Sequence, residues 1–225
     1  SNAFSNSVEM RADDGTEAFG NITFLDSAAV DLDSSASANG DLFINASTDG
    51  AVGGNLSVTA TTGNITQNTA LAITGTTTLV TSADNATITL NNTGNAFTGA
   101  MTITTNDSSG TDADVVIDGG TTALQIAAST IDGDLTLTTG NASGITDSGN
   151  VTVGGNLVAT TDANNGVIDL GTTTVTGTMD LTSHGSGNVT IDNATTDIVL
   201  AASEIGGNLT LTTGNASGIT DSGNV

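Results

Sequence analysis

The chain has 225 residues. It contains 24 acidic side chains and one basic side chain, Arg11, which gives a formal net charge of −23. Binding to nucleic acid or to anionic lipid requires clusters of Lys and Arg, so neither is expected as a direct partner. Pro, Cys, Trp and Tyr are absent, which excludes disulfides, yet apolar residues make up 36% of the chain and are placed too regularly for disorder.

The chain begins with Ser1-Asn2-Ala3, which resembles the scar of a removed expression tag, and we exclude residues 1–3 from the fold prediction. Residues 4–51 have irregular spacing and are interpreted as an N-terminal set of degraded coils or a cap. Residues 52–225 form regular repeats, divided into 52–130, 131–204 and a truncated 205–225. No secretory signal and no apolar run long enough to span a membrane is present.

A short unit recurs through the regular region. It reads Gly-x-[Leu/Met]-x-[Val/Ile/Leu/Ala], and apolar and polar residues alternate within it, which is the signature of a strand. Gly, Asn, Asp and Ser lie between the alternating stretches, as tight turns require. Most units begin about 22 residues after the previous one, and two of the steps are longer. The unit begins at Gly54, Gly75 (a weaker example), Gly99, Gly133, Gly155, Gly177 and Gly207.

A longer duplication is superimposed on the short unit. The segment 131–151 returns at 205–225 with two differences, Asp132→Gly and Asp134→Asn. We count three short units in each long repeat. We therefore expect equivalent surfaces to recur three coils apart, roughly 14 Å along the axis, where an extended partner would meet them more than once.

One short unit cannot fold alone. Five buried aliphatic side chains stabilise it by roughly 8–12 kcal/mol, whereas ordering about 22 residues costs on the order of 20–40 kcal/mol. Stacked neighbours are needed to pair the strand edges and cover the apolar side chains. The sequence therefore predicts an all-β fold, a right-handed parallel β-helix (β-solenoid) with coils of about 22 residues.

Acidic residues gather at two places that suit a hard cation with oxygen ligands. Asp107, Asp112 and Asp114 lie together in an insertion, and Asp13 and Asp14 form a second group. Neither group has the spacing of an EF-hand loop or of a calcium β-roll. Turn formation alone also accounts for these residues, so calcium at Asp107, Asp112 and Asp114 is a hypothesis beside that simpler interpretation. No other cofactor is predicted.

Catalytic residue types are scarce. The β-helix enzymes that act on polysaccharides use clustered carboxylates, often with Lys or Arg. This chain has no Lys, one Arg and one His, His184, which lies in a predicted turn. We predict no catalytic residues, and a polysaccharide-processing enzyme remains as an alternative based on fold analogy.

Repeated Thr-x-Thr pairs suggest a second alternative. Thr102 and Thr104, Thr136 and Thr138, and Thr210 and Thr212 would project outward from equivalent strands. Such ladders resemble the ice-binding faces of antifreeze proteins, which would make this an ice- or mineral-binding surface. Val158 and Asp180 interrupt the pattern, and threonine is also common on exposed strands.

The runs VGGNLSVTATTGNIT, IDGDLTLTTGNASGIT, VGGNLVATTDANNGVIDL and IGGNLTLTTGNASGIT resemble the repeats of filamentous-haemagglutinin-like and autotransporter-type bacterial adhesins. This resemblance implies a right-handed β-helix at the bacterial cell surface or outside the cell, with no catalytic residues to transfer. It also implies a structural stalk or attachment surface, with a cell-surface glycan or a matrix protein as partner. Exposed strand edges at the ends of the stack additionally predict end-to-end self-association.

Overall fold

The computed structural model describes residues 8–11, 20–33, 42–45, 51–52, 54–108 and 112–225. All elements in these ranges are strands or turns, and the strands pair in parallel. Leu135 pairs with Leu157, and Leu157 pairs with Met179, so each coil takes about 22 residues. The predicted parallel β-solenoid is confirmed. The described residues include no helix long and apolar enough to span a membrane.

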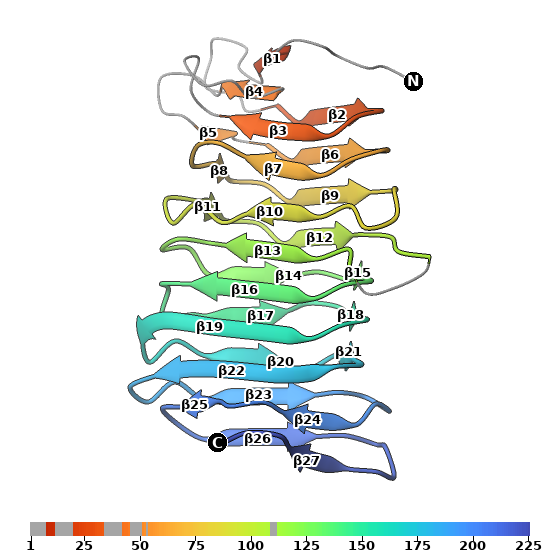
Figure 1. Ribbon diagram of the computed structural model, residues 1–225. Helices are drawn as coiled ribbons and strands as arrows, with labels where there is room; N and C mark the ends of the chain where they lie inside the picture. The colour runs from red at the N-terminus through yellow and green to blue at the C-terminus, as the bar shows by residue number, and fades with distance from the viewer. Residues whose placement is uncertain (1–7, 12–19, 34–41, 46–50, 53, 109–111) are drawn as a thin grey trace.

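Two large sheets form opposite sides of the stack (Figure 1). The front sheet has 12 strands, of which β25 lies off the main path beside β22. In stacking order they are β1 (Val8–Arg11), β4 (Leu42–Asn45), β3 (Val30–Asp33), β7 (Ile65–Gln67), β10 (Ile88–Leu90), β13 (Val115–Asp118), β16 (Leu135–Thr139), β19 (Leu157–Asn164), β22 (Thr178–His184), β24 (Ile198–Leu200) and β27 (Ile219–Asp221), with β25 (Glu204–Ile205).

The back sheet also has 12 strands, three of them in a side branch. Its main path is β2 (Ile22–Asp26), β6 (Leu56–Ala60), β9 (Thr77–Thr81), β12 (Met101–Thr104), β14 (Leu124–Ile126), β17 (Ile145–Asp147), β20 (Ile168–Leu170), β23 (Val189–Asp192) and β26 (Leu209–Thr212). The branch is β15 (Ser129–Ile131), β18 (Val151–Val153) and β21 (Thr173–Val175). A separate three-stranded sheet contains β5 (Ala51–Val52), β8 (Ala72–Ile73) and β11 (Ala96–Phe97).

The direction of the strands defines the hand of the coil. In Figure 1 the front strands run from right to left and the paler back strands from left to right, while the chain descends from the N-terminus. The chain therefore turns clockwise as it moves away from an observer at the N-terminal end. This is the right-handed turn that the usual hand of parallel crossovers predicts.

Alternation along each strand separates the core from the surface. In β16, Leu135, Leu137 and Thr139 are buried, whereas Thr136 and Thr138 are partly exposed. Inward residues stack on their counterparts in neighbouring coils, so the apolar side chains form one continuous core along the solenoid. The core is shared between neighbouring coils, which explains why a single unit is too small to fold alone.

The glycine of the short unit lies at a corner where two coils approach closely. A Cβ atom at Gly155 would lie 2.1 Å from Asp134 Oδ1 and 2.9 Å from the carbonyl carbon of Gly133. The corresponding atom at Gly177 would lie 2.5 Å from Asn156 Oδ1. The motif requires glycine there because any side chain would displace the preceding coil.

An Asn or Asp at the same corner, which in most coils follows this glycine, links successive coils through its side chain. Asp114 Oδ1 accepts the amide of Asp134 (2.8 Å), Asp134 Oδ1 accepts that of Asn156 (2.6 Å), and Asn156 Oδ1 accepts that of Thr178 (2.9 Å). Asn55 likewise accepts the amide of Thr76 at 2.8 Å. We call this series the corner ladder. It satisfies backbone amides at corners, where no strand partner is present.

The long repeat does not return to the same side of the solenoid. Leu135–Thr139 forms β16 in the front sheet, but its copy at Leu209–Thr212 forms β26 in the back sheet. The pair β17 and β27 changes sheet in the opposite direction. One long repeat thus covers three and a half coils, not the three that we counted from the short units.

The extra half-coil lies where the spacing of the short unit is longest. Between Gly99 and Gly133 the strand β12 pairs with both β14 and β15, and between Gly177 and Gly207 the strand β22 pairs with both β24 and β25. A serine fills each gap: Ser129 Oγ accepts the Ile103 amide (3.0 Å), and Ser203 Oγ accepts the Leu181 amide (3.1 Å). Equivalent surfaces therefore appear on opposite sides, which corrects the expectation of a row on one side.

Candidate functional site

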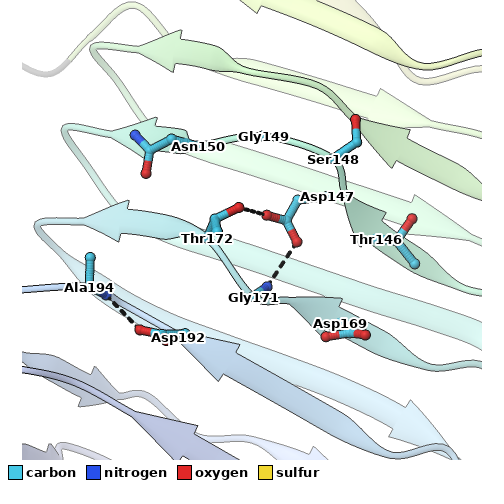
Figure 2. A pocket seen from close by; sticks show the side chains of 10 residues that line it. All are labelled: Thr146, Asp147, Ser148, Gly149, Asn150, Asp169, Gly171, Thr172, Asp192 and Ala194. Atoms are coloured by element: carbon cyan, nitrogen blue, oxygen red, sulfur yellow. Dashed lines mark hydrogen bonds between the residues drawn. The ribbon is translucent and has the colours of Figure 1, made fainter.

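A hollow of about 610 Å³ lies on the back sheet, beside the ends of β17, β20 and β23. Its lining is polar and includes Thr146, Asp147, Asp169, Thr172 and Asp192 (Figure 2). We call it the back groove. Because each of these strands belongs to a different coil, the groove runs across three layers of the stack.

Asp147 forms the upper wall of the groove and is fully engaged. Its Oδ1 accepts the amide of Gly171 at 2.8 Å, and its Oδ2 accepts the hydroxyl of Thr172. Figure 2 shows both contacts bridging from one coil to the next. Asp147 therefore holds the turn after β20 in place and shapes the groove.

Asp169 and Asp192 supply carboxylate oxygens that are available to accept hydrogen bonds from a ligand. Asp169 projects from β20 between Thr146 and Thr190 of the neighbouring coils, is exposed, and makes no hydrogen bond with the described residues. Asp192 Oδ1 accepts the amide of Ala194 at 2.9 Å, which leaves Oδ2 available. The groove thus offers carboxylate and hydroxyl oxygens to a ligand that donates hydrogen bonds.

A near-copy of the upper wall lies on the other side of the solenoid. The sequence Thr146–Asn150 is repeated without change at Thr220–Asn224, and β27 places that copy in the front sheet. In the first long repeat the position of Asp147 is taken by Gln67. Gln67 bonds to Asn95 through both its amide nitrogen (2.8 Å) and its oxygen (2.9 Å). The first long repeat therefore builds this position differently from the two later repeats.

The three residues of the calcium hypothesis do not form one cluster of carboxylates. Asp107 Oδ2 accepts the amide of Asp112 at 3.2 Å, while Asp114 Oδ1 belongs to the corner ladder and accepts the Asp134 amide. Across the described residues, no group of three or more His, Cys, Asp or Glu side chains is placed to hold a metal ion. Residues 109–111 lie outside the described part, and calcium at this loop stays a prediction.

The other residues considered from the sequence lie apart from the groove. Asp13 and Asp14 are outside the described residues, and Arg11 belongs to β1 at the N-terminal end of the front sheet. His184 ends β22, also in the front sheet, and its Nδ1 is buried without a hydrogen-bond partner among the described residues. The single His therefore does not pair with the groove carboxylates, which lie on the back sheet.

The Thr-x-Thr pairs do not form one face. Thr102 and Thr104 lie in the back sheet, Thr136 and Thr138 in the front sheet, and the pair at 210–212 in the back sheet again. On the front sheet, Thr136 is paired with Val158, and Val158 with Asp180. These two residues interrupt the row of threonines, as predicted from the sequence. The half-coil in each repeat explains the separation.

The sequence analysis did not single out the groove residues, although a signal was present. Asp147, Asp169 and Asp192 recur at intervals of about 22 residues, which is the period of the coil. Any outward residue type that recurs at this period lies in neighbouring layers of a parallel solenoid. These three residues are far apart in sequence, so no short segment contains them as a cluster.

A comparison with protein-family profiles found a match to "Repeats of unknown function (DUF5649)" at residues 39–104, 112–165 and 186–225. The chain belongs to this family. The second match begins about as far after the first as the third begins after the second, so the matches recur at the spacing of the long repeat. The family description assigns no activity, and it does not identify a haemagglutinin or an autotransporter.

Comparisons with curated proteins and with solved structures found no significant match. The DUF5649 repeats and the parallel solenoid therefore define the protein at the level of a repeat β-solenoid. The function has to be argued from the surface that these repeats present.

Proposed function

We propose that the chain is a non-catalytic structural stalk and attachment segment of a large bacterial protein that is exposed on the cell surface or secreted. The resemblance of its DUF5649 repeats to adhesin repeats supports this role and this location. The acidic, lysine-free composition supports it as well, because such a surface resists non-specific adsorption to nucleic acid and membranes.

The observation that carries the stalk role is the continuity of the coil-to-coil contacts. The back-sheet path from β2 to β26 and the front-sheet path from β3 to β27 are unbroken, and the corner ladder adds side-chain bonds between layers. Each layer adds about 4.8 Å to the length. Such a stack holds what it carries at a fixed distance, as a spacer must.

The back groove is the attachment surface that we propose within this segment. Asp169 and Asp192 offer free carboxylate oxygens, and Thr146 adds a hydroxyl from the coil above. Sugar hydroxyls and the amines of a matrix protein are donors that complement these groups. Because aromatic side chains are scarce in the chain, recognition depends on hydrogen bonds and charge and not on stacking.

The test is binding of the labelled chain to arrays of glycans, matrix proteins and whole cells, with and without calcium. We expect saturable binding to one class, weakened at least tenfold by Asp169→Asn combined with Asp192→Asn. Asp180→Asn is the matched control, because Asp180 is an outward carboxylate on the front sheet, and it should leave binding unchanged.

Three results would separate the parts of this proposal. Loss of binding in chelator would support calcium at Asp107, Asp112 and Asp114. Binding that is insensitive to the groove variants would refute the groove as the attachment surface while leaving the stalk role in place. Cleavage of a polysaccharide by the purified chain would refute the non-catalytic assignment.

A further inference from the structure

The two nearly identical copies within the long repeat differ in what covers their strands. In the first copy, Leu135 of β16 pairs with Leu157 of the next coil. Ile145 of β17 pairs with Ile168 of that same coil. The second copy forms β26 and β27, which are the last strands on the main paths of their sheets among the described residues. Both lie at the C-terminal end of the stack (Figure 1), and we call their uncovered side the open edge.

The preceding coil makes the same contacts with both copies. The backbone amide of Val115 donates to the carbonyl of Asp134 at 2.8 Å, and that of Val189 donates to the carbonyl of Asn208, also at 2.8 Å. The two copies therefore share their sequence and their neighbour on one side. The open edge presents the surface that β16 and β17 use to pair with the next coil.

The burial of equivalent residues measures what the next coil covers. Ile145 is fully buried, whereas its counterpart Ile219 is 48% exposed. Leu135 is fully buried, whereas its counterpart Leu209 is only partly buried. Since the other surroundings match, the missing coil accounts for the difference. The open edge thus exposes apolar surface whose burial would be favourable.

The backbone of the open edge is ready for the same pairing. The amides of Leu135 and Ile145 donate to the carbonyls of Asn156 (2.8 Å) and Val167 (2.9 Å) in the covering coil. The corresponding amides of β26 and β27 have no such strand partner among the residues that the structure describes. An unpaired parallel edge is a template for one more strand.

The open edge also keeps the shape that fits the covering coil. At Gly144, which has a positive φ of 71°, a Cβ would lie 1.8 Å from the carbonyl oxygen of Val167. Its counterpart Gly218 has a similar φ of 81°, and nothing lies within 4 Å of its Cβ position. The bend that admits the next coil is therefore present before that coil is bound.

We propose that the open edge is a docking surface for an extended, unpaired segment of the same repeat, with the sequence pattern of residues 152–174. The bound segment adds one coil, with its Leu157 position opposite Leu209 and its Ile168 position opposite Ile219. The apolar alternation of the segment fills the exposed core, and its amides and carbonyls complete the two sheets. This surface is separate from the back groove, and the proposal does not depend on it.

Gly155 gives the docking its selectivity. In the first copy, a Cβ at Gly155 would lie 2.1 Å from Asp134 Oδ1 of the preceding coil. Asn208 occupies the position of Asp134 in the open edge and has the same side-chain oxygen. A segment with a side chain at this glycine would be held away from the corner and would not reach the pairing register.

The test is titration of a fluorescently labelled peptide of residues 152–174 with the full chain. Anisotropy is measured at about 0.15 M salt, where repulsion between distant acidic groups is largely screened. We expect saturable binding. Hydrogen exchange at the amides of Leu209 and Ile219 should slow at least tenfold in saturating peptide, because the equivalent amides in the first copy are bonded to the covering coil.

Two peptide variants provide the matched comparison and leave the fold of the chain untouched. The Gly155→Ala peptide should bind at least tenfold more weakly. The Gly171→Ala peptide should bind like the original, because the nearest atom to its Cβ is Asp169 Oδ1 of the same coil, 4.0 Å away.

Four results would overturn the proposal. They are the absence of saturable binding, equal affinity for the Gly155→Ala peptide, and binding that leaves exchange at Leu209 and Ile219 unchanged. The fourth is a dimer of the chain alone, seen by sedimentation velocity, in which both amides are already protected. That result would show that a second copy occupies the open edge.

Discussion

Leu135 and Leu209 occupy the same position in two nearly identical segments, but Leu135 lies in the front sheet and Leu209 in the back sheet. The long repeat therefore rotates by half a turn as it advances by three and a half coils. Side chains that the repeat encodes appear alternately on two opposite sides. A partner that approaches one side meets every second repeat, which spaces equivalent contacts by about seven coils, or roughly 34 Å.

Gly155 should be intolerant of a side chain. In Gly155→Ala the new Cβ would overlap Asp134 Oδ1, 2.1 Å away, so the corner ladder must shift. We expect a loss of about 1–3 kcal/mol in the free energy of unfolding, measured by urea titration. The control is Gly171→Ala, where the nearest atom lies 4.0 Å away. An equal loss in the two variants would show that the close approach is not the cause.

Thr77 is a polar residue in a place built for an apolar one. It is fully buried between Leu56 and Met101 of the adjacent coils, and its Oγ1 has no hydrogen-bond partner among the described residues. Thr77→Val has nearly the same shape and removes the unsatisfied hydroxyl, so it should raise the free energy of unfolding by about 1–2 kcal/mol. Thr78→Val on the outward side of the strand should change it by less than about 0.5 kcal/mol.

Asn156 tests the corner ladder. Its Oδ1 accepts both the amide and the hydroxyl of Thr178 at 2.9 Å. Asn156→Ala should cost about 1 kcal/mol of unfolding free energy in urea titration. Asp134→Asn is the conservative control and should be nearly neutral, because an amide oxygen accepts the same bond and the later copy has Asn208 there. A neutral alanine variant would mean that water replaces the ladder bond at no cost.

Asn193 should be the most sensitive asparagine. Its side-chain amide is buried. Its Oδ1 accepts the backbone N–H of Val175 (2.7 Å), and its Nδ2 donates to the carbonyls of Val175 and Asp197. Asn193→Ala leaves these backbone groups unpaired in the core, and we expect a loss of about 2–4 kcal/mol in a thermal or urea melt. Asn150→Ala, at an exposed position whose Nδ2 bonds only Thr152, should have little effect.

The sequence was sufficient to predict the parallel solenoid, because alternation such as Leu135 and Leu137, combined with a spacing of about 22 residues, has few other solutions. It did not reveal the half-turn. The long steps from Gly99 to Gly133 and from Gly177 to Gly207 correspond to about one and a half coils, but they look like insertions when each short unit is assumed to complete one coil. Sequence shows where corners occur and does not show which corner of the stack a glycine occupies.

The candidate site was less predictable for a related reason. Asp147, Asp169 and Asp192 come together only through the stacking of three coils, and which outward side they share depends on the register of those coils. The Asp107, Asp112 and Asp114 loop was conspicuous because its residues are close in sequence. Proximity in sequence proved to be a poor guide to shared contacts in a fold where neighbours are about 22 residues apart.

The half-turn can be measured directly from the dipolar coupling between two spin labels, since the chain has no cysteine of its own. Line broadening in continuous-wave spectra reports the short separations, and double electron–electron resonance reports the longer ones. Labels at Thr136→Cys and Thr210→Cys occupy equivalent positions in the two copies, and labels at Thr136→Cys and Asp180→Cys provide a same-sheet control two coils apart. We predict that the equivalent positions are separated across the thickness of the stack, by clearly more than the roughly 17 Å of axial rise, whereas the control pair lies at about 10 Å. A distance of about 14 Å between Thr136→Cys and Thr210→Cys would place both copies on one side at three coils per repeat and would contradict the account.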